Sequence, residues 1–87
     1  LTKALALEWA RYDIRVNALC PGYIETPLNT AFFDTDPGKA LIRRIPQRRL
    51  GQLSDLDAPV MLLASDASSF MTGATLAVDG GHLISSL

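Results

Sequence analysis

The sequence predicts an α/β fold, and two neighbouring segments carry this prediction. Residues 1–11, LTKALALEWAR, contain only good or neutral helix formers and neither Gly nor Pro. Residues 14–19, IRVNAL, alternate in the manner of a strand and run into a Pro-Gly turn. A helix, a tight turn, a strand and a Pro-Gly loop form the αβ half of a βαβ unit.

The helix predicted over residues 1–11 is apolar on two sides. Leu1, Leu5 and Trp9 line one side, and Leu7 and Ala10 lie on the other. A helix on the surface of a domain has a single apolar stripe. We therefore expect this helix to be covered on both sides, by a sheet and by another helix.

The strand predicted over residues 14–19 stops at Cys20-Pro21-Gly22. Pro cannot donate a hydrogen bond to a strand ladder, and Gly permits a sharp turn. In open α/β sheets, ligands bind outside the carboxyl ends of the strands. Residues 21–27 are therefore the best-placed binding loop of the chain.

Residues 28–53 are less regular and contain one short predicted helix. Asp36 and Pro37 are a suitable N-cap and first helical residue. The helix then extends to about Ile45, where Pro46 ends it.

A capping box predicts the next helix. Ser54, with Asp57 three residues later, begins a helix that continues to about Ala64. Pro59 lies past the first turn of that helix, where it would remove a backbone hydrogen bond. We therefore expect a kink or a late start.

The end of the chain predicts a loop and a short strand. Residues 66–73 are rich in Ser and close with Gly73, and residues 74–78 follow as a strand that ends at Asp79-Gly80-Gly81. The sequence contains no repeat, low-complexity tract or linker, so residues 1–87 are predicted to belong to one unit.

Composition excludes several classes of protein. With 48% apolar residues, 20% charged residues and a net charge of −1, the chain is neither disordered nor a partner for nucleic acid. No apolar run is long enough to span a membrane. Cys20 is the single cysteine, which favours a reducing compartment such as the cytoplasm. The chain begins with Leu1 inside a helical pattern, so we expect a piece of a larger protein.

Spacing alone shows no catalytic centre. No two glycines are separated by one residue, so there is no glycine-rich phosphate-binding turn, and no G-x-S-x-G motif occurs. His82 has no cysteine near it in the sequence, so we expect no metal site, and it is expected at the surface.

The order of the sequence blocks is more specific than any one of them. LTKALALEWA, IRVNALCPGYIETPL and RRLGQLSDLDAPVMLLASDASSFMTGATLAVDGG together resemble the C-terminal part of classical short-chain dehydrogenases/reductases. The N-A-x-x-P-G-x-I-x-T pattern of that family is matched by Asn17, Ala18, Pro21, Gly22, Ile24 and Thr26. The resemblance implies the C-terminal part of a doubly wound, parallel-sheet Rossmann fold that is incomplete as a domain.

The resemblance also implies an activity. The family uses NAD or NADP to interconvert an alcohol and a carbonyl in small molecules by hydride transfer. Its catalytic Ser, Tyr and Lys are expected upstream of Leu1, so this chain contains no catalytic residue and is expected to be inactive alone. Tyr12 and Tyr23 do not substitute, because the residues four positions later are Val16 and Pro27. The residues that select NAD or NADP also lie outside this chain.

The resemblance assigns the cofactor-binding role to the Pro-Gly loop. Pro21 and Gly22 place backbone against the nicotinamide ring, the main chain of Ile24 holds the carboxamide, and the hydroxyl of Thr26 adds a hydrogen bond. A planar amide needs a donor and an acceptor at a fixed separation, which these groups provide. The alternative is that Pro-Gly only ends a strand and that Thr26 caps the helix after Pro27. The flanking blocks favour binding.

Residues 27–50 correspond to the variable substrate-binding lid of the family. Leu28 and Phe32, together with Phe33, line an apolar substrate wall or serve as ordinary packing residues. Four arginines in residues 43–49 meet an anionic substrate or form a solvated charge run.

The resemblance further implies a homo-oligomer, a dimer or a tetramer, assembled through residues 1–11, 54–64 and 74–78. A protein of a different class remains as the alternative: a non-catalytic relative, or an interaction module that uses its apolar helix faces.

Overall fold

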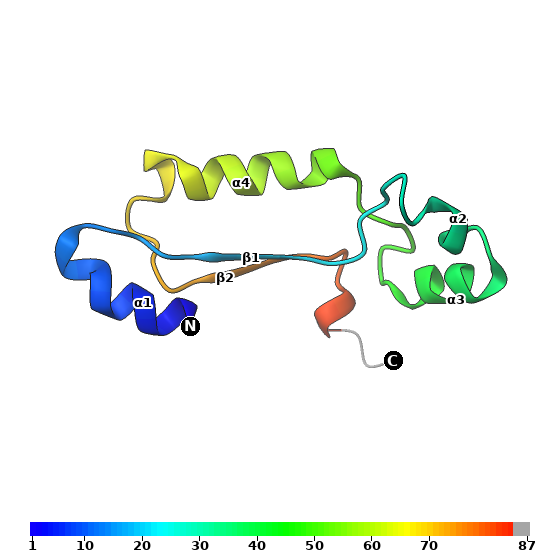
Figure 1. Cartoon of the computed structure of the whole chain (residues 1–87), viewed down its shortest axis with the longest axis horizontal. Coiled ribbons are helices and arrows are strands. Elements are labelled where there is room, and N and C mark those ends of the chain that lie inside the picture. Colours follow the sequence, from blue (N-terminus) through cyan, green and yellow to red (C-terminus); the bar gives the residue numbers. More distant parts are fainter. Residues whose placement is uncertain (85–87) are drawn as a thin grey trace.

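The computed structural model describes residues 1–84, which form helices on both sides of two strands (Figure 1). The α-helices are α1 (Thr2–Trp9), α2 (Thr30–Phe33), α3 (Asp36–Arg44) and α4 (Asp57–Ala64), and the strands are β1 (Ala18–Pro21) and β2 (Thr75–Val78). Short 3₁₀ turns occupy Ala10–Tyr12, Leu53–Leu56, Asp66–Ser68 and His82–Ile84. No helix within residues 1–84 has the length and apolar character that a membrane crossing requires.

The two strands pair in parallel, with Ala18 opposite Thr75 and Pro21 opposite Val78. Parallel neighbours need a crossover between them, and here it includes α4, which lies along one face of the strands while α1 lies on the other (Figure 1). The predicted α/β class with parallel strands is confirmed.

The predicted bounds of the first strand were wrong, because β1 begins at Ala18 and not at Ile14. The backbone of Val16 bonds to a loop: its N–H donates to the Thr72 hydroxyl at 3.1 Å, and its carbonyl accepts from Gly73 N–H at 2.8 Å. The carboxamide of Asn17 holds the same loop by accepting from Ala74 N–H. An alternating apolar pattern does not show whether the backbone of a residue bonds to a strand or to a loop, so the pattern placed the start of the strand too early.

Pro21 ends β1 as part of the strand, although we expected it to lie outside. Ala18 N–H donates to Ala74 O at 2.9 Å, and Gly22 N–H donates to Val78 O at 3.0 Å. Donors to one neighbour alternate along a strand, so the nitrogen of Pro21 faces the edge opposite β2. Its missing N–H therefore costs this pair no hydrogen bond.

Helix α3 begins one residue away from the prediction. Its N-cap is Thr35, whose hydroxyl accepts from Gly38 N–H, and Asp36 is its first helical residue. The end of the helix at Arg44, before Pro46, agrees with the prediction. Helix α2, a single turn, was not predicted.

The predicted capping box was also misplaced. The carboxylate of Asp55 accepts from Gln52 N–H at 2.8 Å, so the pair that opens this segment is Gln52 and Asp55, not Ser54 and Asp57. A 3₁₀ turn follows and α4 starts at Asp57. Pro59 thus falls in the first turn of α4, where it is tolerated. The late start expected from Pro59 is confirmed.

Residues 25–50 form an excursion from the strands, and the two ends of this segment lie next to each other at Gly51. Glu25 N–H donates to Gly51 O at 2.8 Å, and Gly51 N–H donates to Tyr23 O at 2.9 Å. Phe33, Ile45 and Leu50 form a small core inside this excursion. A Cβ at Gly38 would collide with the backbone of residues 32–33, so this glycine lets α3 pack against α2.

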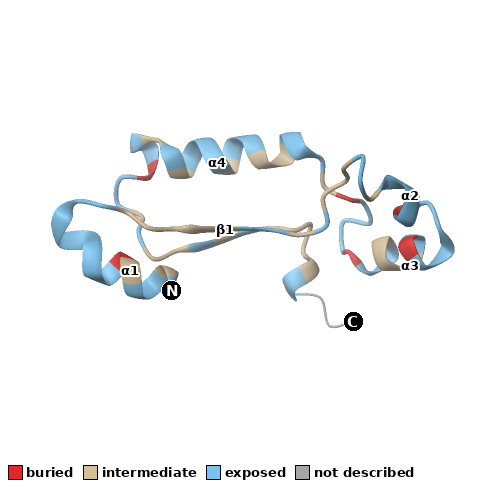
Figure 2. Ribbon diagram, viewed as in Figure 1, coloured by how far each residue is buried: buried red, intermediate tan, exposed pale blue. Residues whose placement is uncertain are grey.

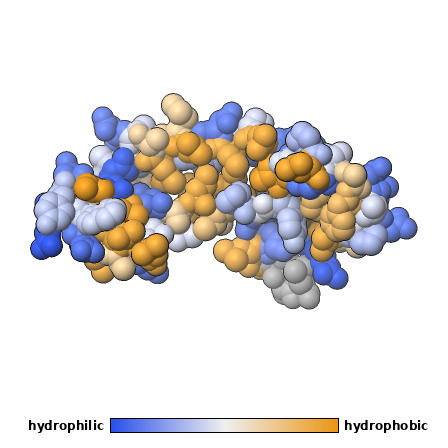
Figure 3. Space-filling view, viewed as in Figure 1, coloured by the Kyte–Doolittle hydropathy of each residue, from blue (hydrophilic) through white to orange (hydrophobic). Residues whose placement is uncertain are grey.

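The described chain is elongated, and little of its apolar surface is buried (Figure 2). Its extents are 50 × 26 × 19 Å and its radius of gyration is 15.9 Å, against roughly 12 Å for a compact domain of this length. In α1 only Ala6 is buried, and Leu7 is 84% exposed. The expected cover on both sides of this helix is therefore not supplied by residues 1–84. Apolar surface is visible over α1 and between α4 and the strands (Figure 3).

Arg15 ties the start of β1 to the end of α4. Its guanidinium donates to Ser65 O at 3.1 Å, to Ser68 O at 2.9 Å and to the Ser68 hydroxyl at 2.7 Å. The carbonyls at a helix C-terminus carry partial negative charge, which favours a cation there. Ser68 is only 2% exposed, so water cannot readily replace these bonds.

Replacing Arg15 by Met should lower the free energy of unfolding by about 2 kcal/mol, because buried acceptors lose their donors. Urea unfolding of the protein measures this loss. Arg43→Met on the exposed side of α3 is the control and should stay within about 0.5 kcal/mol of wild type. Equal losses in the two variants would contradict the role of Arg15.

Asp55 links stability to pH. The hydrogen bond from Gln52 N–H, and then the bond of 3.0 Å from the Arg49 guanidinium, hold the pKa of Asp55 below 3.8. A carboxylate whose pKa is lowered by folding contributes stability above its unfolded pKa, and this contribution is lost as the pH falls through the folded pKa.

Asp55→Asn should therefore be less stable than wild type at neutral pH, and the difference should shrink as the pH falls below 3.8. Denaturant unfolding at a series of pH values measures it. Asp13→Asn removes the same charge at an exposed carboxylate that makes no hydrogen bond within residues 1–84. If the difference in the free energy of unfolding between wild type and Asp55→Asn stays constant with pH, the ionised carboxylate is not the stabilising species.

Candidate functional site

The predicted binding loop lies at the carboxyl ends of both strands. Gly22 follows β1 directly and stands beside Asp79, which follows β2. A Cβ at Gly22 would lie 2.7 Å from the Cβ of Asp79. Glycine is therefore required here by the close approach of the two strand ends. The carboxylate of Asp79 in turn accepts from Gly81 and Leu83 N–H and fixes the turn after β2.

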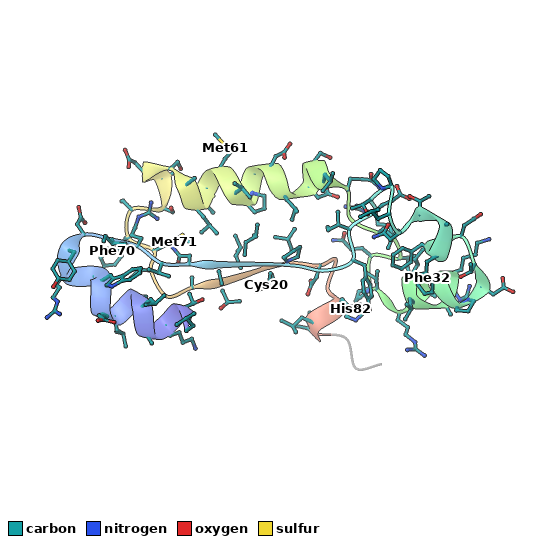
Figure 4. The ribbon with its side chains drawn as sticks, viewed as in Figure 1. Cys20, Phe32, Met61, Phe70, Met71 and His82 are labelled. Atoms are coloured by element: carbon teal, nitrogen blue, oxygen red, sulfur yellow. The ribbon has the colours of Figure 1, made fainter. Side chains whose placement is uncertain are left out.

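Two cavities open at this edge. The first, of about 320 Å³, is mostly apolar and is lined by residues 20–23 at the end of β1 and by Asp79, His82 and Leu83. Cys20 and His82 lie on the face of the strands opposite α4 (Figure 4). The second, of about 370 Å³, is lined by Ile24, Arg49, Gly51 and residues 77–81. Tyr23 lines both cavities. Of the predicted cofactor residues, Pro21 and Gly22 reach the first cavity and Ile24 reaches the second, whereas Thr26 lines neither.

The backbone of residues 24–26 is held by Asn29, which sequence reasoning missed. The Asn29 side chain donates from Nδ2 to Ile24 O at 2.8 Å and accepts at Oδ1 from Thr26 N–H at 2.9 Å. Its own N–H donates to Thr26 O at 3.1 Å. Asn is a common turn residue because its side chain bonds nearby backbone, but the sequence does not tell which backbone groups it reaches.

Two polar groups of this loop remain open. The N–H of Ile24 and the hydroxyl of Thr26 make no hydrogen bond to another of residues 1–84. The alternative role for Thr26, a cap on the following helix, does not hold in this form: its carbonyl, not its hydroxyl, receives Thr30 N–H and the Thr30 hydroxyl. The hydroxyl is therefore free to bond a ligand.

Tyr23 connects the loop to two other segments. Its ring centroid is 5.7 Å from that of Phe33 in the excursion and 5.4 Å from that of His82. His82 is half-buried, and its Nδ1 is buried without a hydrogen-bond partner among residues 1–84. The expectation that His82 lies at the surface holds only in part, because one side of its ring packs edge-on against Tyr23.

The two predicted substrate residues lie apart from the loop. Leu28 is 97% exposed, and Phe32 is 47% exposed and packs edge-on against Phe33, with a centroid distance of 5.2 Å. Neither lines the two cavities described above. Phe33 is 8% exposed and belongs to the core, so for this residue ordinary packing is the correct interpretation.

The arginines of residues 43–49 are exposed, as a solvated charge run would be. Arg49 alone among them makes an ion pair within residues 1–84, with Asp55 at 3.0 Å. Within that same part of the chain, no three His, Cys, Asp or Glu side chains gather in a way that could hold a metal ion.

Comparison with known proteins gives the same family from several directions. The family model described as enoyl-(acyl carrier protein) reductase matches residues 1–82. The 2-dehydro-3-deoxy-D-gluconate 5-dehydrogenase of Dickeya dadantii is 47% identical over 85 residues, which cover 95% of this chain and 33% of that protein. The 3beta-hydroxysteroid dehydrogenase 1 of Eggerthella lenta is 49% identical over 82 residues, covering 93% of this chain and 31% of that protein.

Solved structures agree with these relatives. A gluconate 5-dehydrogenase from Burkholderia cenocepacia, crystallised in complex with NADP and tartrate, superposes with a TM-score of 0.87 at 45% identity. The match covers 97% of this chain and 33% of that one. The chain thus spans about a third of the length of the relatives it matches. On the match of the family model to nearly all of its length, the chain belongs to the short-chain dehydrogenase/reductase family.

Proposed function

We propose that this chain is the C-terminal third of an NAD(P)(H)-dependent oxidoreductase that interconverts an alcohol and a carbonyl. In this proposal the segment supplies the loop that holds the nicotinamide end of NAD or NADP. The observation that carries it is a pair of open polar groups in the loop after β1: the N–H of Ile24, a residue that lines the second cavity, and the hydroxyl of Thr26 two residues further on. The order of the sequence blocks supports the C-terminal placement.

The residues present fit a nicotinamide. Its carboxamide offers one acceptor and two donors, which the N–H of Ile24 and the hydroxyl of Thr26 complement. Pro21 and Gly22 line an apolar cavity that suits a flat ring. When bound, the nicotinamide supplies or accepts the hydride. This chain's own contribution is to hold the ring in one orientation, which determines the face that is presented to the substrate.

Proton transfer would come from outside residues 1–87. Neither tyrosine of this chain matches the Tyr-x-x-x-Lys pattern, and the ring of Tyr23 is packed between Phe33 and His82. We place the catalytic Ser, Tyr and Lys upstream of Leu1. The segment alone would then bind part of the cofactor without catalysing its chemistry.

Residues 27–50 of the excursion would act as the substrate lid. It has a core of its own and is closed at its base by the Tyr23–Gly51 and Glu25–Gly51 bonds, which suits a unit that covers a bound molecule. Leu28 and Phe32 present exposed apolar side chains that a substrate would contact after closure. The relatives named above act on a sugar-acid derivative and on a steroid, by their names. The shared chemistry is a secondary alcohol or ketone in a small molecule.

The uncovered apolar surfaces support a homo-oligomer, a dimer or a tetramer, in the parent protein. Leu7 on α1 and Met61 on α4 are 84% and 67% exposed, and Figure 4 shows Met61 on the side of α4 away from the strands. Such surface is normally covered by other protein. The single cysteine suits the cytoplasm.

Thr26→Val should weaken NAD(P)H binding by the full-length protein roughly tenfold, because a hydrogen bond from the loop is lost while the shape of the side chain is kept. Thr26→Ser retains the hydroxyl and is the matched control, with near wild-type affinity. Titration of the nicotinamide fluorescence measures both. Unchanged affinity in the Val variant would remove Thr26 from the site.

The coding sequence upstream of Leu1 should contain, in frame, a Tyr-x-x-x-Lys pair near Leu1 and a glycine-rich turn further upstream. Sequencing of the encoding DNA tests this directly. An upstream sequence without the pair would exclude the oxidoreductase and favour the alternative, a non-catalytic relative or interaction module that binds through α1 and α4. The exposed side chains of Leu7 and Met61 are the observation that favours this alternative.

A further inference from the structure

We propose that Asn29 is the positioning residue of the nicotinamide loop, an inference that rests on the proposed function. Asn29 lines neither of the two cavities, and none of its bonds would be to the cofactor. It acts through Ile24 and Thr26, whose backbone it holds with both the nitrogen and the oxygen of its carboxamide.

One of the two bonds needs a donor in the side chain and the other needs an acceptor close to it. Nδ2 of Asn29 donates to Ile24 O at 2.8 Å, and Oδ1 accepts from Thr26 N–H at 2.9 Å. A carboxylate of the same size accepts from Thr26 but has no proton to donate to Ile24, and an apolar side chain does neither. The position therefore requires a short carboxamide.

These bonds fix the peptide groups on both sides of Glu25. The Ile24–Glu25 peptide is held at both ends, since its carbonyl accepts from Asn29 and its N–H donates to Gly51 O at 2.8 Å. The Glu25–Thr26 peptide is held by its N–H. The N–H of Ile24 belongs to the preceding Tyr23–Ile24 peptide, whose carbonyl accepts from Gly51 N–H at 2.9 Å. With these three consecutive peptide groups held, the backbone of Thr26, which carries the free hydroxyl, is fixed relative to the free N–H of Ile24. Preorganisation of this kind reduces the entropy that binding must remove.

The same residue joins the loop to the excursion. Asn29 is the N-cap of α2, yet its side chain makes no cap bond to that helix and turns back to residues 24–26. Helix α2 is instead attached through Thr30, whose N–H and hydroxyl both donate to Thr26 O, at 3.1 Å and 2.7 Å. A shift of α2 is thereby transmitted to the loop.

Asn17 provides a matched control within the same chain. Its Nδ2 donates to Met71 O at 3.0 Å and its Oδ1 accepts from Ala74 N–H at 3.0 Å, the same pair of bonds that Asn29 makes. It stands before β1, at the end of the strand opposite to the proposed cofactor site. Loss of its donor should cost stability without a selective effect on the nicotinamide.

The test compares Asn29→Asp with Asn17→Asp in the full-length protein. Each variant is titrated with NADPH and with 2′-phospho-ADP-ribose, and with NADH and ADP-ribose; the second member of each pair lacks the nicotinamide. Asn29→Asp should weaken binding of the reduced dinucleotides roughly tenfold and leave the affinity for the ring-free probes unchanged. Asn17→Asp should lower the midpoint of urea unfolding and leave the ratio of the two affinities at the wild-type value.

Three outcomes separate the hypotheses. If Asn29→Asp weakens binding of a dinucleotide and of its ring-free counterpart equally, or weakens neither, the positioning role is overturned. Wild-type protein that binds none of the four probes overturns the proposed function itself. Where Asn29→Asp does not fold, Asn29→Ser replaces it; its hydroxyl is shorter than the carboxamide and cannot span both groups, so the same selective loss is expected.

Discussion

The parallel pairing of β1 with β2 is the constraint on which the rest of the structure depends. Because both strands run in the same direction, their carboxyl ends meet at one edge, and Gly22 comes to lie against Asp79. The absence of a side chain at Gly22 lets the two turns approach. The cavity beside them, with Tyr23 packed on His82, follows from that approach. A residue larger than glycine here would push the ends of the two strands apart and change the shape of this cavity.

Parallel pairing also explains the crossover through α4, but not the excursion of residues 25–50. Two parallel neighbours cannot be joined by a hairpin, so the chain must travel back along the sheet, which α4 accomplishes. Residues 25–50 are an addition to that minimum, and their ends are fastened to each other by the bonds of Gly51 to Tyr23 and Glu25. The addition carries its own core of Phe33, Ile45 and Leu50. Its stability is therefore partly separate from that of the strands.

The sequence allowed the prediction of those features that depend on local backbone chemistry. The first helix, the Pro-Gly turn, the last strand and the late start of α4 all follow from propensity and from the restrictions of Pro and Gly. The start of β1 was misplaced because the partners of Val16 lie more than fifty residues further on, in the loop before β2. The capping box was displaced because the sequence allows both the Gln52–Asp55 and the Ser54–Asp57 pairs, and the structure uses the first.

The candidate site divides in the same way. Pro21, Gly22, Ile24 and Thr26 were proposed through a motif, and the first three line the cavities at the carboxyl ends of the strands, but the residues that support this loop were not visible in the sequence. Asn29 and Tyr23 act by contacts whose partners are set by the fold: Asn29 bonds the backbone of Ile24 and Thr26, and Tyr23 packs between Phe33 and His82. A residue that contacts a ligand directly must be of one type at a fixed position in the motif. A supporting residue must only supply a suitable shape and suitable hydrogen-bond donors and acceptors, and several residue types at several positions can do so. A sequence pattern therefore does not determine the supporting residues of a site. Here these residues also connect the loop to the excursion.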